Sequence, residues 1–145
     1  MKKVLSALLV TVCFCILGFA QSGMKVHAAT NEEIAIQRHI EGDELFEQEN
    51  YIKAISKYSE AIQLNPKLAS AYFQRARCYE ELANYEQAIK DYKKYLSVPH
   101  DDEDDDGNVY AAIAWCYKQL GQYSESKKYY EKARKYGWSG ILYAE

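Results

Sequence analysis

The chain has 145 residues, of which 48% are hydrophobic and 14% aromatic, and its formal net charge at pH 7 is −3. Three of its 18 basic residues lie in the N-terminal segment 1–28, so the rest of the chain carries a net charge near −6. Nucleic acids and anionic membranes both attract concentrated basic charge. The composition therefore argues against either of them as the main partner.

The N-terminus has the pattern of a secretory signal. Two lysines, Lys2 and Lys3, precede the apolar run 4–20. A charged start followed by such a run is typical of an exported chain. We therefore expect a protein that is secreted or held in the cell envelope.

The leader has more than one interpretation. We expect residues 1–28 to be a signal peptide cut after Ala28, and a second small-residue site lies after Ala20. The alternative is an uncleaved membrane anchor, because the apolar run approaches the roughly 17 residues that can just span a bilayer. The remainder, 29–145, is of single-domain length, and we expect no membrane insertion of this mature domain.

One local pattern occurs three times in the rest of the chain, opening at Tyr51, Tyr85 and Tyr123. The intervals are 34 and 38 residues, and an acidic run before the third unit takes up the extra four. A fixed period in this range marks stacked helical hairpins, in which no unit buries its apolar face alone. The repetition favours a binding scaffold over an enzyme.

Within the first unit the apolar residues have helical spacing. From Tyr51 to Leu64 they recur at i, i+3, i+4 and i+7, which is the stripe of an amphipathic helix. Pro66 then ends the helix, because the residue before a proline avoids the helical region. The turns between paired helices are short, so each pair must form an antiparallel hairpin.

The repeated unit resembles the tetratricopeptide repeat, which asks for large, small and aromatic residues in fixed slots. The first unit fills these slots with Arg38, Gly42, Leu45, Tyr51, Ala54, Tyr58, Ala61 and Pro66. The second has Tyr72, Ala76, Tyr79, Tyr85, Ala88, Tyr92, Tyr95 and Pro99. The third has Tyr110, Ala114, Tyr117, Tyr123, Ser126, Tyr130 and Ala133, with Gly137 near the proline slot.

This resemblance implies an all-α solenoid of three antiparallel helix-turn-helix repeats, at about 35–68, 69–102 and 107–140. It also implies a non-catalytic scaffold for protein interaction. Three residues depart from the family pattern, namely Arg38, Tyr95 and Ser126. We expect these departures to affect local packing and not the architecture.

In proteins of this family the first helices of successive units line a concave groove. The resemblance therefore implies that a peptide or protein partner contacts His39, Asp43, Phe46, Phe73, Arg77, Glu80, Trp115 and Lys118. Aromatic anchors beside cationic side chains suit an extended peptide. The alternative is that these residues merely occupy helix positions.

The family's chaperone-tail clamp uses Lys and Asn in the first repeat, then Lys and Arg later. Those slots hold His39, Asp43, Asn108 and Ala112 in this chain. The resemblance therefore does not imply binding of a chaperone tail.

No catalytic motif is present in the sequence. Outside the leader the only histidines are His39 and His100, and neither has a Cys or His at metal-ligand spacing. No phosphate-binding glycine loop and no nucleophile motif occurs either. We expect no enzymatic activity and no cofactor.

The acidic run before the third unit has two interpretations. Asp102, Asp104 and Asp106, followed by a glycine, match the opening of a calcium loop, but Ile113 stands where a bidentate glutamate is expected. Calcium binding here would make the chain a calcium-responsive structural protein, our second hypothesis. The other interpretation is a solvated linker whose Asp106 or Asn108 caps the next helix.

Two further features concern packing. Cys78 and Cys116 occupy equivalent slots one repeat apart. The axes of neighbouring helices lie about 8–10 Å apart, whereas a disulfide needs alpha carbons within about 7 Å of each other. We therefore expect two buried thiols rather than a bridge. After the third unit a short apolar segment either caps the last hairpin or mediates self-association or docking. This segment consists of Trp138, Ile141, Leu142 and Tyr143.

Overall fold

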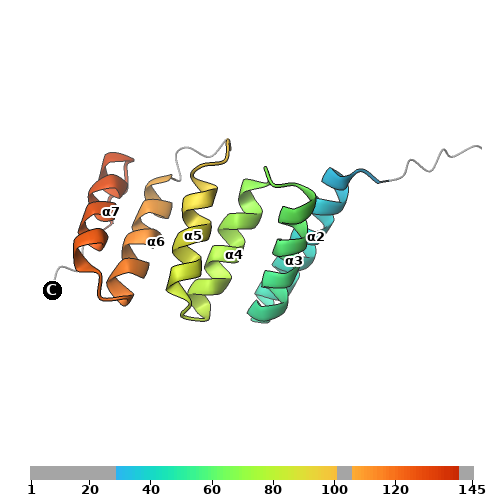
Figure 1. The fold of residues 1–145 in the computed structure, drawn as a ribbon, viewed down its shortest axis with the longest axis horizontal. Coiled ribbons are helices and arrows are strands. Elements are labelled where there is room, and N and C mark those ends of the chain that lie inside the picture. The colour runs from blue at the N-terminus through green and yellow to red at the C-terminus, as the bar shows by residue number, and fades with distance from the viewer. Residues whose placement is uncertain (1–28, 101–105, 141–145) are drawn as a thin grey trace, which may run out of the picture.

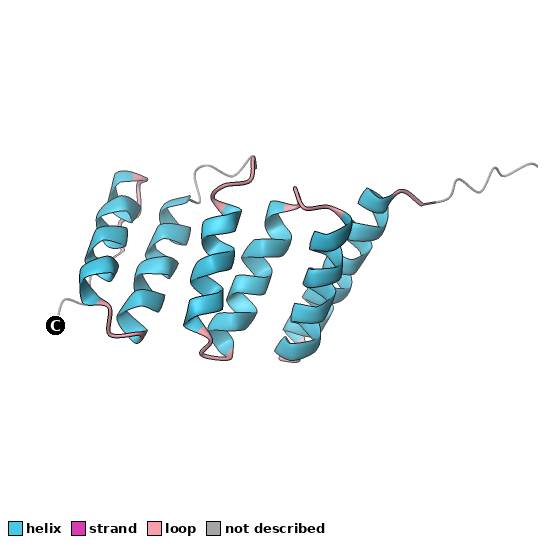
Figure 2. Ribbon diagram, viewed as in Figure 1, coloured by secondary structure: helices cyan, strands magenta, loops and turns pink. Residues whose placement is uncertain are grey.

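The computed structural model describes residues 29–100 and 106–140, and every regular element in these ranges is an α-helix (Figure 2). The helices are α2 (Asn31–Glu47), α3 (Tyr51–Leu64), α4 (Ala69–Glu81), α5 (Tyr85–Tyr95), α6 (Asp106–Gln119) and α7 (Tyr123–Lys135). They pair as α2–α3, α4–α5 and α6–α7, and the hairpins stand in a row with α2 and α7 at opposite ends (Figure 1). The predicted solenoid of three helix-turn-helix units is confirmed.

Some predictions concern residues outside the described ranges. These are the leader 1–28, the carboxylates of Asp102 and Asp104, and the cap residues 141–143. They stay predictions. None of the helices within 29–100 and 106–140 has the length and apolar character needed to cross a membrane.

The helix boundaries follow from local chemistry. At the start of α2 the hydroxyl of Thr30 accepts from the backbone N–H of Glu33 at 3.2 Å, and the Glu33 carboxylate accepts from the Thr30 N–H at 2.7 Å. Two residues after the end of each first helix the backbone has a positive φ, which is 58° at Glu49, 53° at Ala83 and 71° at Gly121. Only the third repeat places glycine there, so the first two turns accept the steric cost of a side chain.

Alanines and tyrosines fill the contacts between helices. Ala54, Ala61 and Ala76 are fully buried and let neighbouring helices approach closely. Tyr58 and Tyr92, at 0% and 1% exposure, are the largest fully buried side chains in the described residues. Cys78 and Cys116 are free and fully buried, as predicted.

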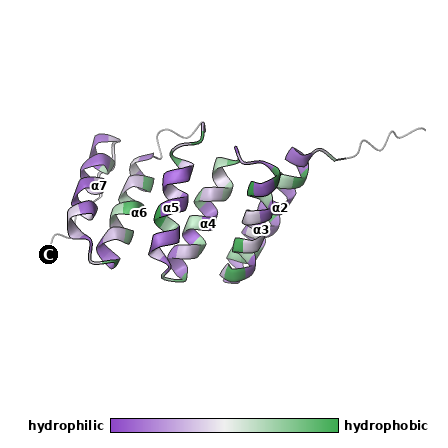
Figure 3. Ribbon diagram, viewed as in Figure 1, coloured by the Kyte–Doolittle hydropathy of each residue, from purple (hydrophilic) through white to green (hydrophobic). Residues whose placement is uncertain are grey.

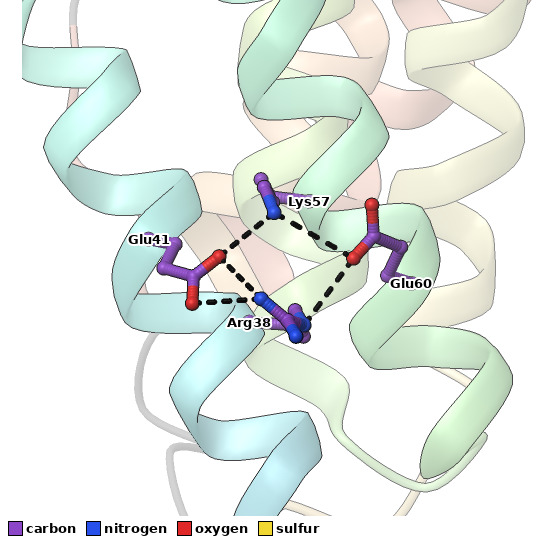
Figure 4. Close-up of polar contacts among 4 residues, drawn as sticks. All are labelled: Arg38, Glu41, Lys57 and Glu60. Atoms are coloured by element: carbon purple, nitrogen blue, oxygen red, sulfur yellow. Dashed lines mark hydrogen bonds and ion pairs between the residues drawn. The ribbon is translucent and has the colours of Figure 1, made fainter.

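Arg38, which departs from the family pattern, belongs to a ring of charges that joins α2 to α3 (Figure 4). Its guanidinium contacts Glu41 at 2.7 Å and Glu60 at 3.3 Å. Lys57 contacts the same two carboxylates at 2.8 and 3.7 Å. The first hairpin thus uses ion pairs where the other hairpins have a tyrosine in the Arg38 slot.

The slots of Glu41 and Lys57 change their chemistry from one hairpin to the next. In the second hairpin they hold Arg75 and Asp91, which pair through two bonds of 2.7 and 2.9 Å with the charges reversed. In the third they hold Ile113 and Tyr129, which pack in the main core cluster. Because an exchange would place Glu41 opposite Asp91 and Arg75 opposite Lys57, like charges disfavour the pairing of a first helix with the second helix of the other hairpin.

Candidate partner-binding site

Four of the eight predicted contact residues lie in one chain of contacts between α2 and α4. His39 Nδ1 lies 3.0 Å from Asp43 Oδ2, and the Gln74 amide donates to Asp43 Oδ1 at 3.3 Å. Arg77 donates to the Gln74 amide oxygen at 3.0 Å, and its guanidinium stacks 4.5 Å from the centre of the Phe46 ring. We call this set of five residues the α2–α4 network. Its side chains are held in place by one another.

The Asp43 carboxylate is held in place by the hydroxyl of a buried tyrosine. The hydroxyl of Tyr58 donates to Asp43 Oδ1 at 2.8 Å. Burial raises the pKa of Tyr58 far above its ordinary value, so the phenol stays a donor. The Asp43 side chain nevertheless keeps 39% of its surface exposed. It can therefore accept a further hydrogen bond from a ligand.

His39 is less available than the sequence indicated. Its side chain is only 15% exposed and its ring packs edge-on against Tyr58, 5.4 Å between centroids. Nε2 is buried and has no hydrogen-bond partner among the described residues. His39 therefore packs against Tyr58 next to Asp43, and its contact with a partner stays a prediction.

Trp115 on α6 forms the second exposed part of the predicted site. It is 40% exposed, and the Tyr85 ring of α5 meets it edge-on at 5.4 Å. Lys118 follows three residues later on the same helix. An indole that is packed against a neighbouring ring and still partly exposed provides a preformed apolar anchor.

Phe73 and Glu80, which were also predicted as contact residues, are engaged in the packing of α4. Phe73 lies against Tyr92 and Tyr95, with centroids 5.8 and 5.5 Å apart. Glu80 accepts hydrogen bonds from the Tyr92 hydroxyl and, at 3.5 Å, from the Cys116 thiol. Burial raises the pKa of the Glu80 carboxyl. Partner contact by these two side chains stays a prediction, while their packing role is clear.

The acidic run meets the described residues at its last member. Asp106 begins α6 and its carboxylate lies 3.0 Å from His100 Nε2. Gly107 is helical and abuts the backbone after α7, since an added Cβ would meet the Tyr136 carbonyl oxygen at 2.6 Å. The glycine of the predicted calcium loop, Gly107, therefore allows close packing of α6 against this backbone rather than a sharp turn. Residues 29–100 and 106–140 contain no group of three candidate metal ligands.

The first residue of the predicted C-terminal cap lies against the last helix. The Trp138 N–H donates to the Ala133 carbonyl at 3.0 Å, and its ring lies 5.6 Å from Tyr130. Trp138 therefore packs on α7, and capping by the whole segment stays a prediction. The rest of the segment lies outside the described residues.

Sequence reasoning missed two members of the site. Gln74 links Asp43 to Arg77, and Tyr85 supports Trp115. A signal for Gln74 was present, because it precedes Arg77 by three residues and so shares its helix face. Tyr85 carried no such signal, since its slot was already explained as repeat packing.

Two family models of the tetratricopeptide repeat match this chain. The family described as "TPR repeat" matches residues 42–82, and the one described as "Tetratricopeptide repeat" matches residues 69–99 and 107–135.

Among curated proteins, Hsp70-Hsp90 organizing protein 1 of Glycine max is 39% identical over 66 residues, which is 46% of this chain and 12% of that protein. Dynein axonemal assembly factor 4 of Pongo pygmaeus is 44% identical over 57 residues, 39% of this chain and 14% of that protein. The chain therefore spans only a small part of the length of these relatives.

Solved structures share the fold. The N-terminal domain of stress-induced protein-1 from C. elegans gives a TM-score of 0.71 at 17% identity, over 76% of this chain and 89% of that one. MamA gives 0.64 at 27% identity, over 70% and 57%. The first TPR domain of Spaghetti, bound to an HSP90 peptide, gives 0.66 at 20% identity, over 82% and 88%. The tetratricopeptide family matches together cover residues 42–99 and 107–135, so the chain belongs to the tetratricopeptide repeat family of non-catalytic protein-interaction domains, with about three repeats.

Proposed function

We propose that this chain binds an extended peptide or protein segment across its first helices, with the Arg77–Phe46 stack and Trp115 as its two anchors. The observation that carries the proposal is the α2–α4 network, in which four residues predicted to contact a partner are joined to one another. A cation stacked on an aromatic ring offers both an apolar surface and a donor. Because the network is already ordered, a ligand loses less free energy in fixing it.

The chemistry of Asp43 indicates what kind of segment fits. Its exposed carboxylate accepts hydrogen bonds and repels another carboxylate. The Spaghetti domain was solved with an HSP90 peptide, but the clamp slots of this chain hold His39, Asp43, Asn108 and Ala112. We therefore propose an internal segment carrying an aromatic or aliphatic anchor beside a basic or amide side chain, rather than a chain terminus rich in carboxylates.

We also propose that the protein acts outside the cytoplasm, as a secreted or envelope component. The support is the charged start and apolar run of residues 1–20. The capping box at Thr30 agrees with it, because the first helix then begins shortly after the expected cut behind Ala28. The mass of the mature chain isolated from its host tests this proposal: retention of residues 1–28 would contradict a cleaved leader.

A binding experiment tests the proposed site. Peptides are selected from a random phage-displayed library on the full chain, and their affinity is measured by indole fluorescence in a Trp138→Phe background, where Trp115 is the remaining tryptophan. We expect Arg77→Ala to weaken binding by about 2 kcal/mol, the loss typical of a central anchor. Trp115→Ala, for which binding is measured by calorimetry, should weaken binding by at least as much.

The matched control is Ile52→Ala on α3, because Ile52 is 72% exposed but lies on a second helix. It should leave the affinity unchanged. Selected peptides that bind Arg77→Ala and Trp115→Ala as tightly as the parent chain would reject the site. The peptide SRMEEVD, named in the Spaghetti structure, should not compete.

A further inference from the structure

In each of the first two hairpins, the second helix presents aliphatic residues to the hairpin that follows. In α5 the pair is Ile89 and Leu96, which share a core cluster with Ile113 and Cys116 of α6. In α3 the Ile89 slot holds Ile55, which packs in the cluster that contains Cys78 of α4. Stacking of successive repeats therefore depends on apolar residues in these two slots.

The last helix changes both slots to cations. Lys127 stands in the slot of Ile55 and Ile89, and Arg134 stands in the slot of Leu96. Both are exposed on α7. Figure 3 shows α7 in hydrophilic colours over most of its visible length. Trp138 packs on Tyr130 beside them and leaves both cations open to solvent.

The first helix shows the complementary change. The slot that holds Cys78 in α4 and Cys116 in α6, both buried against the preceding hairpin, holds Glu44 in α2. Glu44 is exposed, and Ile36 and Ile40 on the same face are 46% and 45% exposed. This end of the row therefore combines an acid with two uncovered aliphatic side chains.

Tyr123 is a further residue on the α7 end whose equivalent in the preceding repeat contacts the next hairpin. Its equivalent in the second repeat, Tyr85, packs against Trp115 of the next hairpin. Tyr123 has no following hairpin within the described residues and is 68% exposed. The α7 end thus carries an aromatic residue and two cations in the slots that elsewhere contact a first helix.

We propose that the α7 end binds the α2 end of a second copy of this chain. The contact repeats the stacking of a second helix on the next first helix, with Lys127 and Arg134 of one copy facing Glu44 of the other. Charges of opposite sign across the junction favour this pairing over α2 on α2 or α7 on α7. Ile36 and Ile40 become covered at the same time.

Such a junction uses different surfaces on the two copies. It therefore leaves one free end of each kind and produces open chains of increasing length rather than a closed dimer. Salt weakens the junction, because exposed charges are screened beyond about 8 Å at physiological ionic strength. The first helices remain side by side along the assembly, so the junction does not depend on the proposed peptide site.

Sedimentation velocity of the full chain tests the proposal. A tail-blocked variant carries Lys127→Glu and Arg134→Glu, and a head-blocked variant carries Ile40→Lys and Glu44→Lys. We expect the parent chain to form larger species as its concentration rises and as salt is lowered, and each variant alone to stay monomeric. An equal mixture of the two should associate again, because both kinds of junction between unlike variants bring opposite charges together, whereas each variant alone presents like charges to itself.

Two controls accompany this test. Lys53→Glu, an exposed charge reversal on α3, should assemble as the parent does. Circular dichroism must show equal helicity in all variants. A parent chain that is monomeric at every concentration overturns the proposal, and so does association that both blocked variants retain, which would assign it to other segments of the chain. Either result leaves the peptide-affinity measurement on Trp115 untouched.

Discussion

Asp91→Ala is expected to lower the free energy of unfolding by about 3–5 kcal/mol, the loss typical of removing one partner from a buried ion pair. The side chains of Arg75 and Asp91 are only 18% and 6% exposed. Burial lowers the pKa of Arg75, but the hydrogen bonds and charge of Asp91 outweigh this effect and raise it, so the guanidinium stays charged. Without Asp91 it keeps only the 2.9 Å bond to Ser59. Urea unfolding followed by circular dichroism measures the loss.

Two companion variants identify the cause. Arg75→Met with Asp91→Leu removes both charges, and should restore most of the stability because no buried charge is then left alone. Glu86→Ala, at an exposed position of the same helix, should change the free energy of unfolding by no more than about 0.5 kcal/mol. An Asp91→Ala chain as stable as the Glu86→Ala chain would show that the pair contributes nothing.

Gly42→Ala is expected to cost about 1–3 kcal/mol, the range for overpacking a filled core. A Cβ at this position would lie 2.5, 2.7 and 2.9 Å from three ring atoms of Tyr58. That ring is fully buried and its hydroxyl is bonded to Asp43, so it cannot move aside freely. The substitution should therefore also displace Asp43 and weaken peptide binding.

Gln37→Ala in the same helix is the control for Gly42→Ala, because it changes an exposed side chain and alanine favours helix. Thermal unfolding of the two variants separates packing from helix propensity. A Gly42→Ala chain that unfolds at the parent temperature would mean that α2 and α3 can separate without cost.

The repeat phase could be read from the sequence because it depends on residues that recur. Tyr51, Tyr85 and Tyr123 each open a second helix, as expected from their spacing. Small and aromatic slots translate directly into helix contacts, since a close crossing needs a small residue whatever surrounds it. The fold was therefore predictable.

The orientation of individual site residues was not predictable to the same degree. Phe73 and Glu80 occupy slots that face a partner in the family, but Tyr92 of the next helix draws both toward the core. That outcome depends on the size and hydrogen-bonding capacity of a neighbour, which no single-helix pattern contains. The same holds for the reversed charges of the Arg75–Asp91 pair, which appear only when two hairpins are superposed slot by slot.

Site-specific photocrosslinking tests the central claim, that the partner lies across the first helices, most directly. A photoreactive phenylalanine analogue replaces Trp115 in one variant and Ile52 in another, and each is irradiated with a library-selected peptide. We predict crosslinks from position 115 and none from position 52, although both positions are exposed. Crosslinks from position 52 with none from 115 would contradict the claim and place the partner on the second helices.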